Sequence, residues 1–363
     1  MAKQNLIKRI FDLYTSDLSF EEIQKLIKKE SAEVYEFFAA DLPKTDKSKN
    51  KFSRALIFAR NLFNAFLLKL KPARRVFYLA ALLFFIVGYA QQIDSYVIIA
   101  FLIFNLLIAF ELADKLTAKD ELDIARKIQS DLIPQQPPTN KYYDIAAYYE
   151  SAKEVGGDYF DIIESQTDKN KTFIIIGDIS GKGMGAALYM TRVQAIIQLL
   201  VTNFNNIKDV LINLKKYFSK NLRKEYFLTI IVASIDGRGS IRLCSAGHSP
   251  VLHYRYEDDE FDELNPTGLG IGLNDKGTFE KVLEEVKVSP KKNDILVFYT
   301  DGVTETMNRN KSQFGLNTLK RIIRQNSDMN PYQLKDQVLN EISMFRGDAS
   351  KSDDLTLIIL KRK

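Results

Sequence analysis

The chain has 363 residues, which corresponds to about two domains at roughly 150 residues each. Hydrophobic residues make up 46% of it and charged residues 27%, which excludes a wholly disordered chain. The single cysteine, Cys244, excludes an intrachain disulfide and a cysteine-rich zinc site, and two histidines exclude a histidine-rich one. Any metal must therefore be held mainly by oxygen ligands.

The N-terminal part of the chain is basic. Residues 1–75 contain 16 Lys and Arg against 9 Asp and Glu, although the net charge of the whole chain is only +5. Apolar residues recur at helical spacing, so residues 1–72 are predicted to form a cytoplasmic helical region without a secretory signal. A basic block can bind nucleic acid or an anionic membrane surface. Because an apolar segment follows, membrane lipid is the expected partner and nucleic acid is not.

Residues 73–112 are predicted to be a two-span transmembrane hairpin. Two uncharged runs, 76–90 and 96–110, are each 15 residues long and are separated by QQIDS. Flanking residues extend each run toward the ~20 residues that a spanning helix needs. Both runs are apolar on all sides, which disfavours a buried hairpin in a soluble core. The basic residues before the first run place both ends of the hairpin in the cytoplasm. The expected location is the inner (cytoplasmic) membrane, multi-pass.

Residues 113–138 are predicted to be a helical linker. The segment 111–132 contains neither Gly nor Pro, and a proline-rich stretch follows it. Apolar residues such as Ile124 and Ile128 lie on one face of this helix. That face either packs on its own domain or forms a parallel homodimer through residues 111–133 that carries a signal from the membrane. A stripe of one heptad does not separate the two interpretations.

From Tyr142 onward, short apolar runs alternate with helices, which predicts an α+β domain over residues 139–363 with a largely antiparallel sheet. The apolar runs are 173–176, 228–235, 241–244, 295–299 and 355–360. The candidate helices are 186–203, 207–223, 315–325 and 331–345. About 220 residues can build a single sizeable core.

Four acidic sites stand at the ends of apolar runs. Asp158 lies in VGGDYFD, Asp178 follows FIIIG, Asp301 follows ILVFYT, and Asp353 with Asp354 precedes LTLIIL. Taken singly, each is an ordinary turn or helix-cap residue. As a convergent set they would repel one another unless divalent cations lay between them. Hard Mg²⁺ or Mn²⁺ suits such all-oxygen ligation.

Six motifs in this order resemble the PPM family of metal-dependent Ser/Thr phosphatases, and most closely its bacterial SpoIIE/RsbU-type branch. They are VGGDYFD, GDISGKGMGAAL, SAGHSP, TGLGIGL, FYTDGVTE and DDLTLIIL. The similarity runs from about Glu121, through ARKIQSDLIP, to Lys363, and it does not cover residues 1–110. The resemblance implies a β-sandwich of two packed sheets flanked by helices, preceded here by the all-α N-terminal region.

The resemblance also implies the site residues. Asp158, Asp178, Asp301 and Asp353 are expected to be the catalytic, metal-binding carboxylates. The main-chain carbonyl of Ile179 is expected to face a metal as well. Asp354 competes with Asp353 for the last position. Asp353 is preferred because it matches the first residue of the family pattern D-[DN]-[LM]-[ST].

The implied reaction is hydrolysis of phosphoserine or phosphothreonine by a water that two cations, Mn²⁺ or Mg²⁺, activate. The implied substrate is a phosphorylated STAS-type anti-sigma factor antagonist. Other branches of the family place a histidine where this chain has Ser180, and many relatives have one in place of Lys182, so no general acid is assigned. His248 in SAGHSP is interpreted as a turn residue that supports Pro250.

Two alternatives remain beside the phosphatase. VGGDYF resembles the GGDEF signature of diguanylate cyclases, but Tyr159 replaces its second acidic residue. Asp178, Asp301 and Asp353 would then have no role. The non-enzymatic alternative is a membrane-anchored pseudophosphatase or scaffold that only binds partners, against which the four intact acidic sites argue.

Overall fold

The computed structural model describes residues 51–134, 136–165, 168, 170–273 and 277–363. The chain divides into two compact units, Met1–Thr117 and Ala118–Lys363. The division falls within helix α5, Asp94–Leu132. The predicted N-terminal helical region lies outside the described residues up to residue 50. The four-part division of the chain stays a prediction.

The first unit contains α3 (Lys51–Lys69), α4 (Pro72–Gln91) and the beginning of α5. A tight turn joins α4 to α5: Gln92 has a φ of 56°, and the Ile93 N–H donates to the Gly88 carbonyl at 2.8 Å. A Cβ on Gly88 would lie 2.9 Å from the Cβ of Tyr96, so the two helices need a glycine there to approach so closely. The predicted hairpin of two apolar helices is thus present.

Charged residues meet at the other end of this hairpin. Arg74 pairs with Glu111 at 2.8 Å and with Asp114 at 3.0 Å. Lys71 pairs with the same Asp114 at 2.6 Å. These contacts join the start of α4 to the stretch of α5 just beyond its apolar half. The hairpin is therefore apolar along its helices and charged at the end opposite the turn.

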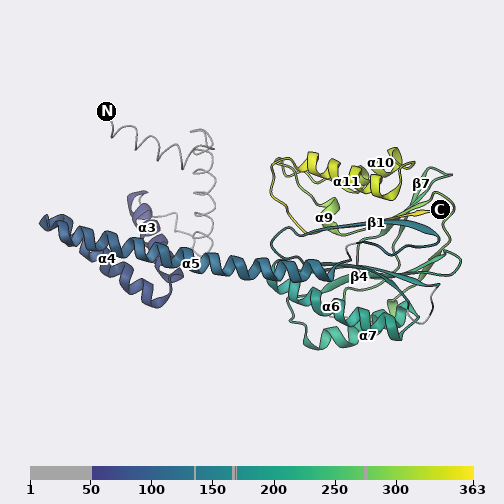
Figure 1. Cartoon of the computed structure of the whole chain (residues 1–363), viewed down its shortest axis with the longest axis horizontal. Helices are drawn as coiled ribbons and strands as arrows, with labels where there is room; N and C mark the ends of the chain where they lie inside the picture. Colours follow the sequence, from purple (N-terminus) through teal and green to yellow (C-terminus); the bar gives the residue numbers. More distant parts are fainter. Residues whose placement is uncertain (1–50, 135, 166–167, 169, 274–276) are drawn as a thin grey trace. The chain divides into compact units, whose positions relative to one another are not determined.

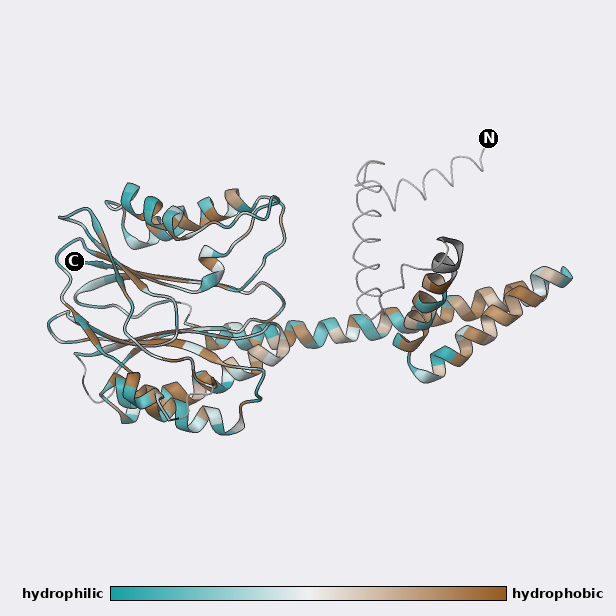
Figure 2. Cartoon of the chain, turned by 180° about the vertical axis from the view of Figure 1, so that it is seen from behind, coloured by the Kyte–Doolittle hydropathy of each residue, from teal (hydrophilic) through white to brown (hydrophobic). Residues whose placement is uncertain are grey.

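Among the described residues, three helices are long and apolar enough to cross a membrane: α4, α5 and α6 (Met184–Asn203). Figure 2 shows the hydrophobic colour along α4 and the first half of α5. Helix α6 differs, because its apolar residues, including Met190, Val193 and Ile197, are buried in the core of the second unit. The two helices of the hairpin therefore correspond to the two predicted spans.

The second unit holds two antiparallel five-stranded sheets. The first has the order β1-β10-β9-β6-β7 and the second β2-β3-β4-β5-β8. The strands of the first sheet are β1 (Tyr143–Glu150), β10 (Leu355–Arg362), β9 (Ile295–Tyr299), β6 (Val251–Arg255) and β7 (Glu260–Leu264). Those of the second are β2 (Asp158–Glu164), β3 (Thr172–Ile179), β4 (Leu228–Ile235), β5 (Ile241–Ala246) and β8 (Val286–Val288).

Helices cover the outer face of each sheet (Figure 1). Helices α6 and α7 (Ile207–Phe218) pack on the second sheet, and α10 (Leu316–Gln325) and α11 (Pro331–Arg346) lie over the first. Two short helices, α8 (Phe279–Val282) and α9 (Asp301–Thr304), lie in connections. The predicted two-sheet β-sandwich flanked by helices is confirmed. The predicted helix over 207–223 is shorter than expected, because a 3₁₀ turn at Ser219–Asn221 follows Phe218.

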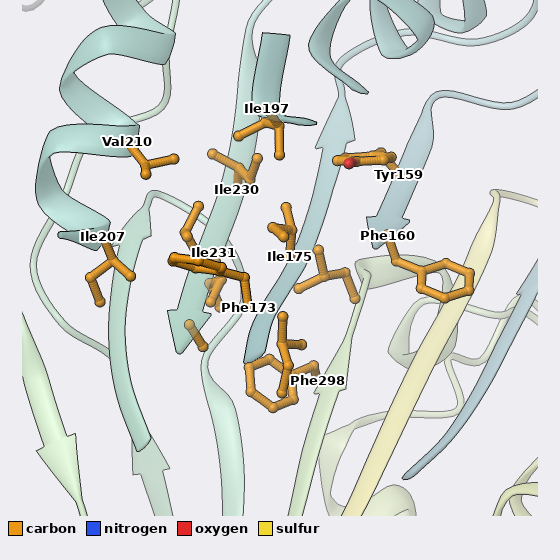
Figure 3. Packing of buried hydrophobic residues seen from close by; sticks show 14 of the residues in the cluster. Tyr159, Phe160, Phe173, Ile175, Ile197, Ile207, Val210, Ile230, Ile231 and Phe298 are labelled. Atoms are coloured by element: carbon orange, nitrogen blue, oxygen red, sulfur yellow. The ribbon is translucent and has the colours of Figure 1, made fainter. Parts of the chain in front are cut away.

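Strand alternation divides the core into two layers. Along β9, Leu296 and Phe298 face the second sheet, whereas Ile295, Val297 and Tyr299 belong to the layer under α10 and α11. Figure 3 shows the larger layer, where side chains of β2, β3 and β4 meet those of α6 and α7. Each buried side chain of this size contributes about 1.5–3 kcal/mol, so the sandwich is a rigid frame for its strand ends.

Candidate active site

Asp158 and Asp178 stand directly opposite each other across the antiparallel pair β2–β3. Asp158 is only 2% exposed. Its Oδ2 accepts hydrogen bonds from the Thr300 hydroxyl at 2.7 Å and the Thr356 hydroxyl at 2.6 Å. Thr300 follows β9 and Thr356 lies in β10, so this carboxylate of the second sheet is held by two donors of the first.

The carboxylates raise one another's pKa. Burial raises the pKa of Asp158 well above its usual range, and the charges of Asp178 and Asp354 raise it further. Burial, together with the charges of Asp301, Asp353 and Asp354, raises the pKa of Asp178 to about 7. The pKa of Asp301 is also raised, by burial and then by Asp353. Without a cation, the fold therefore keeps these carboxylates close together although their charges repel one another.

Two loops of the first sheet carry the remaining acidic residues. Asp301 is the first residue of α9 and is separated from β9 by Thr300 alone, and Asp353 precedes β10. A Cβ on Gly302 would lie 1.8 Å from the carbonyl oxygen of Asp354. The main chains of the two loops are therefore in direct contact, and only glycine fits at position 302.

The two adjacent aspartates differ in what their oxygens contact. Asp354 is 7% exposed and accepts the N–H of Ala152 at 2.7 Å and that of Gly157 at 2.5 Å. Asp353 is more open and pairs through Oδ2 with the ammonium of Lys182 at 2.6 Å. Asp354 thus holds the loop before β2, whereas Asp353 is the more exposed carboxylate of the two.

The carbonyl of Ile179 lies beside the Asp178 carboxylate. A Cβ placed on Gly157 would be 2.9 Å from the Ile179 oxygen and 3.6 Å from Oδ1 of Asp178. The two oxygen ligands expected from the resemblance therefore adjoin the same small space, and the glycine at 157 keeps it open.

Within the part of the chain that the structure describes, no three His, Cys, Asp or Glu side chains are grouped tightly enough to hold a metal. Donors of the protein already hold oxygens of Asp158, Asp353 and Asp354. The chemistry of the donor set nevertheless fits a hard divalent cation, because it offers only oxygen. A cation also relieves the repulsion that, together with burial, raises the pKa of Asp178. The assignment of individual ligands stays a prediction.

Thr300 and Thr356 hold Asp158, but neither residue carries a signal in the sequence pattern. Thr300 lies within FYTDGVTE and Thr356 within DDLTLIIL, two motifs in which the acidic residues carry the pattern. Asp161 accepts from the Tyr159 hydroxyl at 3.1 Å and from Gln198 of α6 at 3.2 Å, so its carboxylate faces α6. His248 is buried, with Nδ1 2.9 Å from the Thr229 hydroxyl, and burial lowers its pKa to about 4.

The family model described as "Stage II sporulation protein E (SpoIIE)" matches residues 168–363, more than half of the chain. The chain belongs to the SpoIIE family. This confirms the resemblance that the six motifs indicated.

The relatives agree with this family. Phosphoserine phosphatase RsbU of Bacillus subtilis is 28% identical over 246 residues, which are 68% of this chain and 71% of RsbU. Phosphoserine phosphatase RsbP of the same organism is 28% identical over 256 residues, and the match spans 59% of its length. The predicted class of enzyme, a phosphatase-type hydrolase, is thus confirmed at the level of the family.

The fold has a close counterpart among solved structures. The SiaA-PP2C domain of Pseudomonas aeruginosa superposes with a TM-score of 0.59 at 17% identity. The superposition covers 69% of this chain and 98% of that domain. At this identity the likeness establishes the fold, which is PP2C-like.

Proposed function

We propose that the chain is a metal-dependent protein phosphatase that hydrolyses phosphoserine or phosphothreonine. The observation that carries this proposal is the convergence of Asp178, Asp301 and Asp353. Burial, and after it the charges of Asp301, Asp353 and Asp354, raise the pKa of Asp178 to about 7. The names of RsbU and RsbP support phosphoserine as the substrate group.

In this proposal, Asp158, Asp178, Asp301, Asp353 and the Ile179 carbonyl form the site that holds two Mn²⁺ or Mg²⁺ ions. Such ions, when bound, supply a water of lowered pKa and neutralise charge on the phosphoryl group. The chain's own residues hold the site in shape. Thr300 and Thr356 fix Asp158, and Asp354 fixes the glycine loop before it.

The experiment uses the full chain purified in detergent, with para-nitrophenyl phosphate and a phosphoserine protein as substrates. We expect hydrolysis with Mn²⁺ or Mg²⁺, none with chelator, and a loss of at least about 100-fold in Asp178→Asn. Asp336→Asn, the same change at an exposed position of α11, is the matched control. A wild-type chain that folds but hydrolyses neither substrate would favour the pseudophosphatase.

For the protein substrate, we infer a phosphorylated STAS-type antagonist, as the resemblance to the SpoIIE/RsbU-type branch implies. The similarity to RsbU supports this choice. The test compares kcat/KM on a phosphorylated STAS protein with that on an unrelated phosphoserine protein. Equal values for the two would contradict the inference.

For the location, we propose that α4 and the first half of α5 cross the inner membrane with both ends in the cytoplasm. The 20 residues of α4 extend about 30 Å, the thickness of the hydrocarbon core. In spheroplasts, an impermeant maleimide should label Gln92→Cys at the turn and label Lys119→Cys only after permeabilisation. The native Cys244 is buried and gives little background.

We further propose that residues 111–133 form a homodimer contact. Ile124 and Ile128 of α5 are each 58% exposed, which is unfavourable for side chains of this size in water. Light scattering of the detergent-solubilised chain should show a dimer that Ile124→Asn weakens and that the neighbouring Lys127→Gln leaves intact.

A further inference from the structure

The last turns of α5 carry a buried amide. Gln129 is 5% exposed, whereas Ile128 and Ser130 on either side of it are exposed. A glutamine in an apolar environment is unfavourable unless both of its amide atoms are hydrogen-bonded. The contacts of Gln129 therefore show what keeps this polar residue inside.

Both halves of the Gln129 amide bind one residue of the loop before β2. Nε2 donates to the Gly156 carbonyl at 2.6 Å, and Oε1 accepts the Gly156 N–H at 3.0 Å. Because the N–H and the carbonyl of Gly156 belong to different peptide planes, the side chain fixes the planes on both sides of that Cα. One amide thus determines the path of the main chain at this point.

The second of these planes also reaches the acidic cluster. Its oxygen is the Gly156 carbonyl held by Gln129, and its N–H is that of Gly157, which donates to Asp354 at 2.5 Å. A Cβ on Gly156 would lie 2.6 Å from that same Asp354 oxygen. The residue that follows Gly157 is Asp158. A rotation of this peptide would therefore move Asp354, Gly157 and Asp158 together.

A second contact fixes the end of α5. Gln194 of α6, which is 4% exposed, donates through Nε2 to the Leu132 carbonyl at 2.5 Å. Helix α6 begins at Met184, six residues after Asp178. The end of α5 is thus attached to the loop that precedes Asp158 and to the helix that follows Asp178.

We infer that Gln129 is a positioning residue of the carboxylate site, acting through the peptide between Gly156 and Gly157. The inference deepens the proposed function and rests on it for its effect on metal binding. Glutamate cannot replace the amide fully, because it accepts the Gly156 N–H but has no donor for the Gly156 carbonyl. Alanine leaves both main-chain groups without their partner.

The experiment compares the full-length wild type, Gln129→Ala and Gln129→Glu in detergent, with Lys127→Ala on the exposed side of α5 as control. Hydrogen exchange of the 152–158 segment is measured without metal, and the Mn²⁺ dissociation constant by calorimetry. We expect Gln129→Ala to accelerate exchange at Gly156 and Gly157 by about 10-fold or more and to weaken Mn²⁺ binding by about 10-fold. Gln129→Glu should have a smaller effect on both quantities. In both Gln129 variants, kcat should fall by a larger factor than KM rises.

Two results would overturn the inference. One is unchanged exchange in the 152–158 segment in both variants. The other is an unchanged Mn²⁺ dissociation constant together with a lower unfolding temperature, which would make Gln129 a purely structural contact. If Gln129→Ala does not fold, the same criteria apply to Gln129→Glu.

The proposed function is tested separately by Asp178→Asn. If the wild type binds Mn²⁺ no better than Asp178→Asn, the metal assignment is wrong. The exchange measurement then decides alone whether Gln129 orders the loop.

Discussion

The carboxylate of Asp158 in β2 accepts a hydrogen bond from the hydroxyl of Thr356 in β10 at 2.6 Å, and the two strands belong to different sheets. A buried polar contact of this kind joins the sandwich at the end where the acidic residues gather. The contact also ties the position of one carboxylate to the strand that follows Asp353 and Asp354.

Replacing Thr356 by valine keeps the shape of the side chain and removes this donor. Asp158 then keeps Thr300 as a donor to the same oxygen, so we expect a loss of about 1–3 kcal/mol in the free energy of unfolding. Urea denaturation in the presence of chelator measures it. Thr202→Val is the control, since that hydroxyl only bonds to the Gln198 carbonyl within α6. Equal losses of unfolding free energy in the two variants would show that the hydrogen bond from Thr356 to Asp158 contributes no more than an ordinary hydroxyl contact.

Alanine substitutions should separate Asp353 from Asp354. Asp354→Ala leaves the N–H groups of Ala152 and Gly157 without an acceptor, so we expect a loss of stability of about 1–3 kcal/mol without metal. Asp353→Ala removes a partly exposed ion pair and one hydrogen bond from the neighbouring Asp354 N–H, and it should change metal-free stability by only about 1 kcal/mol.

The same two variants differ in their response to Mn²⁺. The wild type should gain about 2.7 kcal/mol at a free concentration 100 times the dissociation constant. Asp353→Ala should gain far less. Thermal unfolding with and without Mn²⁺ measures both effects. A full gain in Asp353→Ala would show that Asp353 is not a ligand.

Gly302→Ala should prevent the loops of Asp301 and Asp353 from packing together. The added Cβ would lie 1.8 Å from the Asp354 carbonyl oxygen, a main-chain atom that cannot move aside cheaply. We expect a loss of more than about 3 kcal/mol, beyond the usual range for a single substitution. Gly315→Ala is the control, because it meets no atom within 4 Å and is strained only by its φ of +80°. Circular dichroism during urea unfolding compares the two, and similar losses would contradict the packing argument.

His248 should make stability depend on pH in the acid range. Burial lowers its pKa from 6.5 to about 4, so the folded chain favours the neutral ring. The stabilising contribution is fully present above pH 6.5 and is lost as the pH falls through about 4. Between these values, the wild type should lose more unfolding free energy than His248→Gln, which has no proton to bind. Parallel slopes in the two proteins would show that His248 does not titrate in this range.

The continuous apolar strands were predictable from the sequence. β3, β4 and β9 are buried on both faces, so they appear as uninterrupted apolar runs. Two acidic residues were found at the ends of these runs: Asp178 is the next-to-last residue of β3, and Asp301 comes two residues after β9. β2 and β7 were not predicted as strands, because DYFDIIE and EFDEL carry acidic residues that resemble loop composition. Tertiary pairing overrides that local signal.

The supporting contacts of the site were not predictable. The bond between Gln129 and Gly156 joins residues 27 positions apart, and the one between Thr356 and Asp158 joins residues 198 apart. No periodicity or short motif encodes which distant group a buried side chain will contact. The sequence indicated the chemistry of the acidic residues, and the fold supplies the residues that hold them.

The pairing of β1 with β10 has a consequence for how the chain folds. Glu150 lies opposite Leu355, far away in the sequence, whereas β2 to β5 pair in sequential order. Since long-range pairing forms slowly, we expect the second sheet to form first and to bring Asp158 and Asp178 together early. Asp301 and Asp353 join them only when β9 and β10 close the first sheet. A divalent cation should therefore slow the unfolding of the folded chain. Added during refolding, it should not accelerate the earliest folding phase.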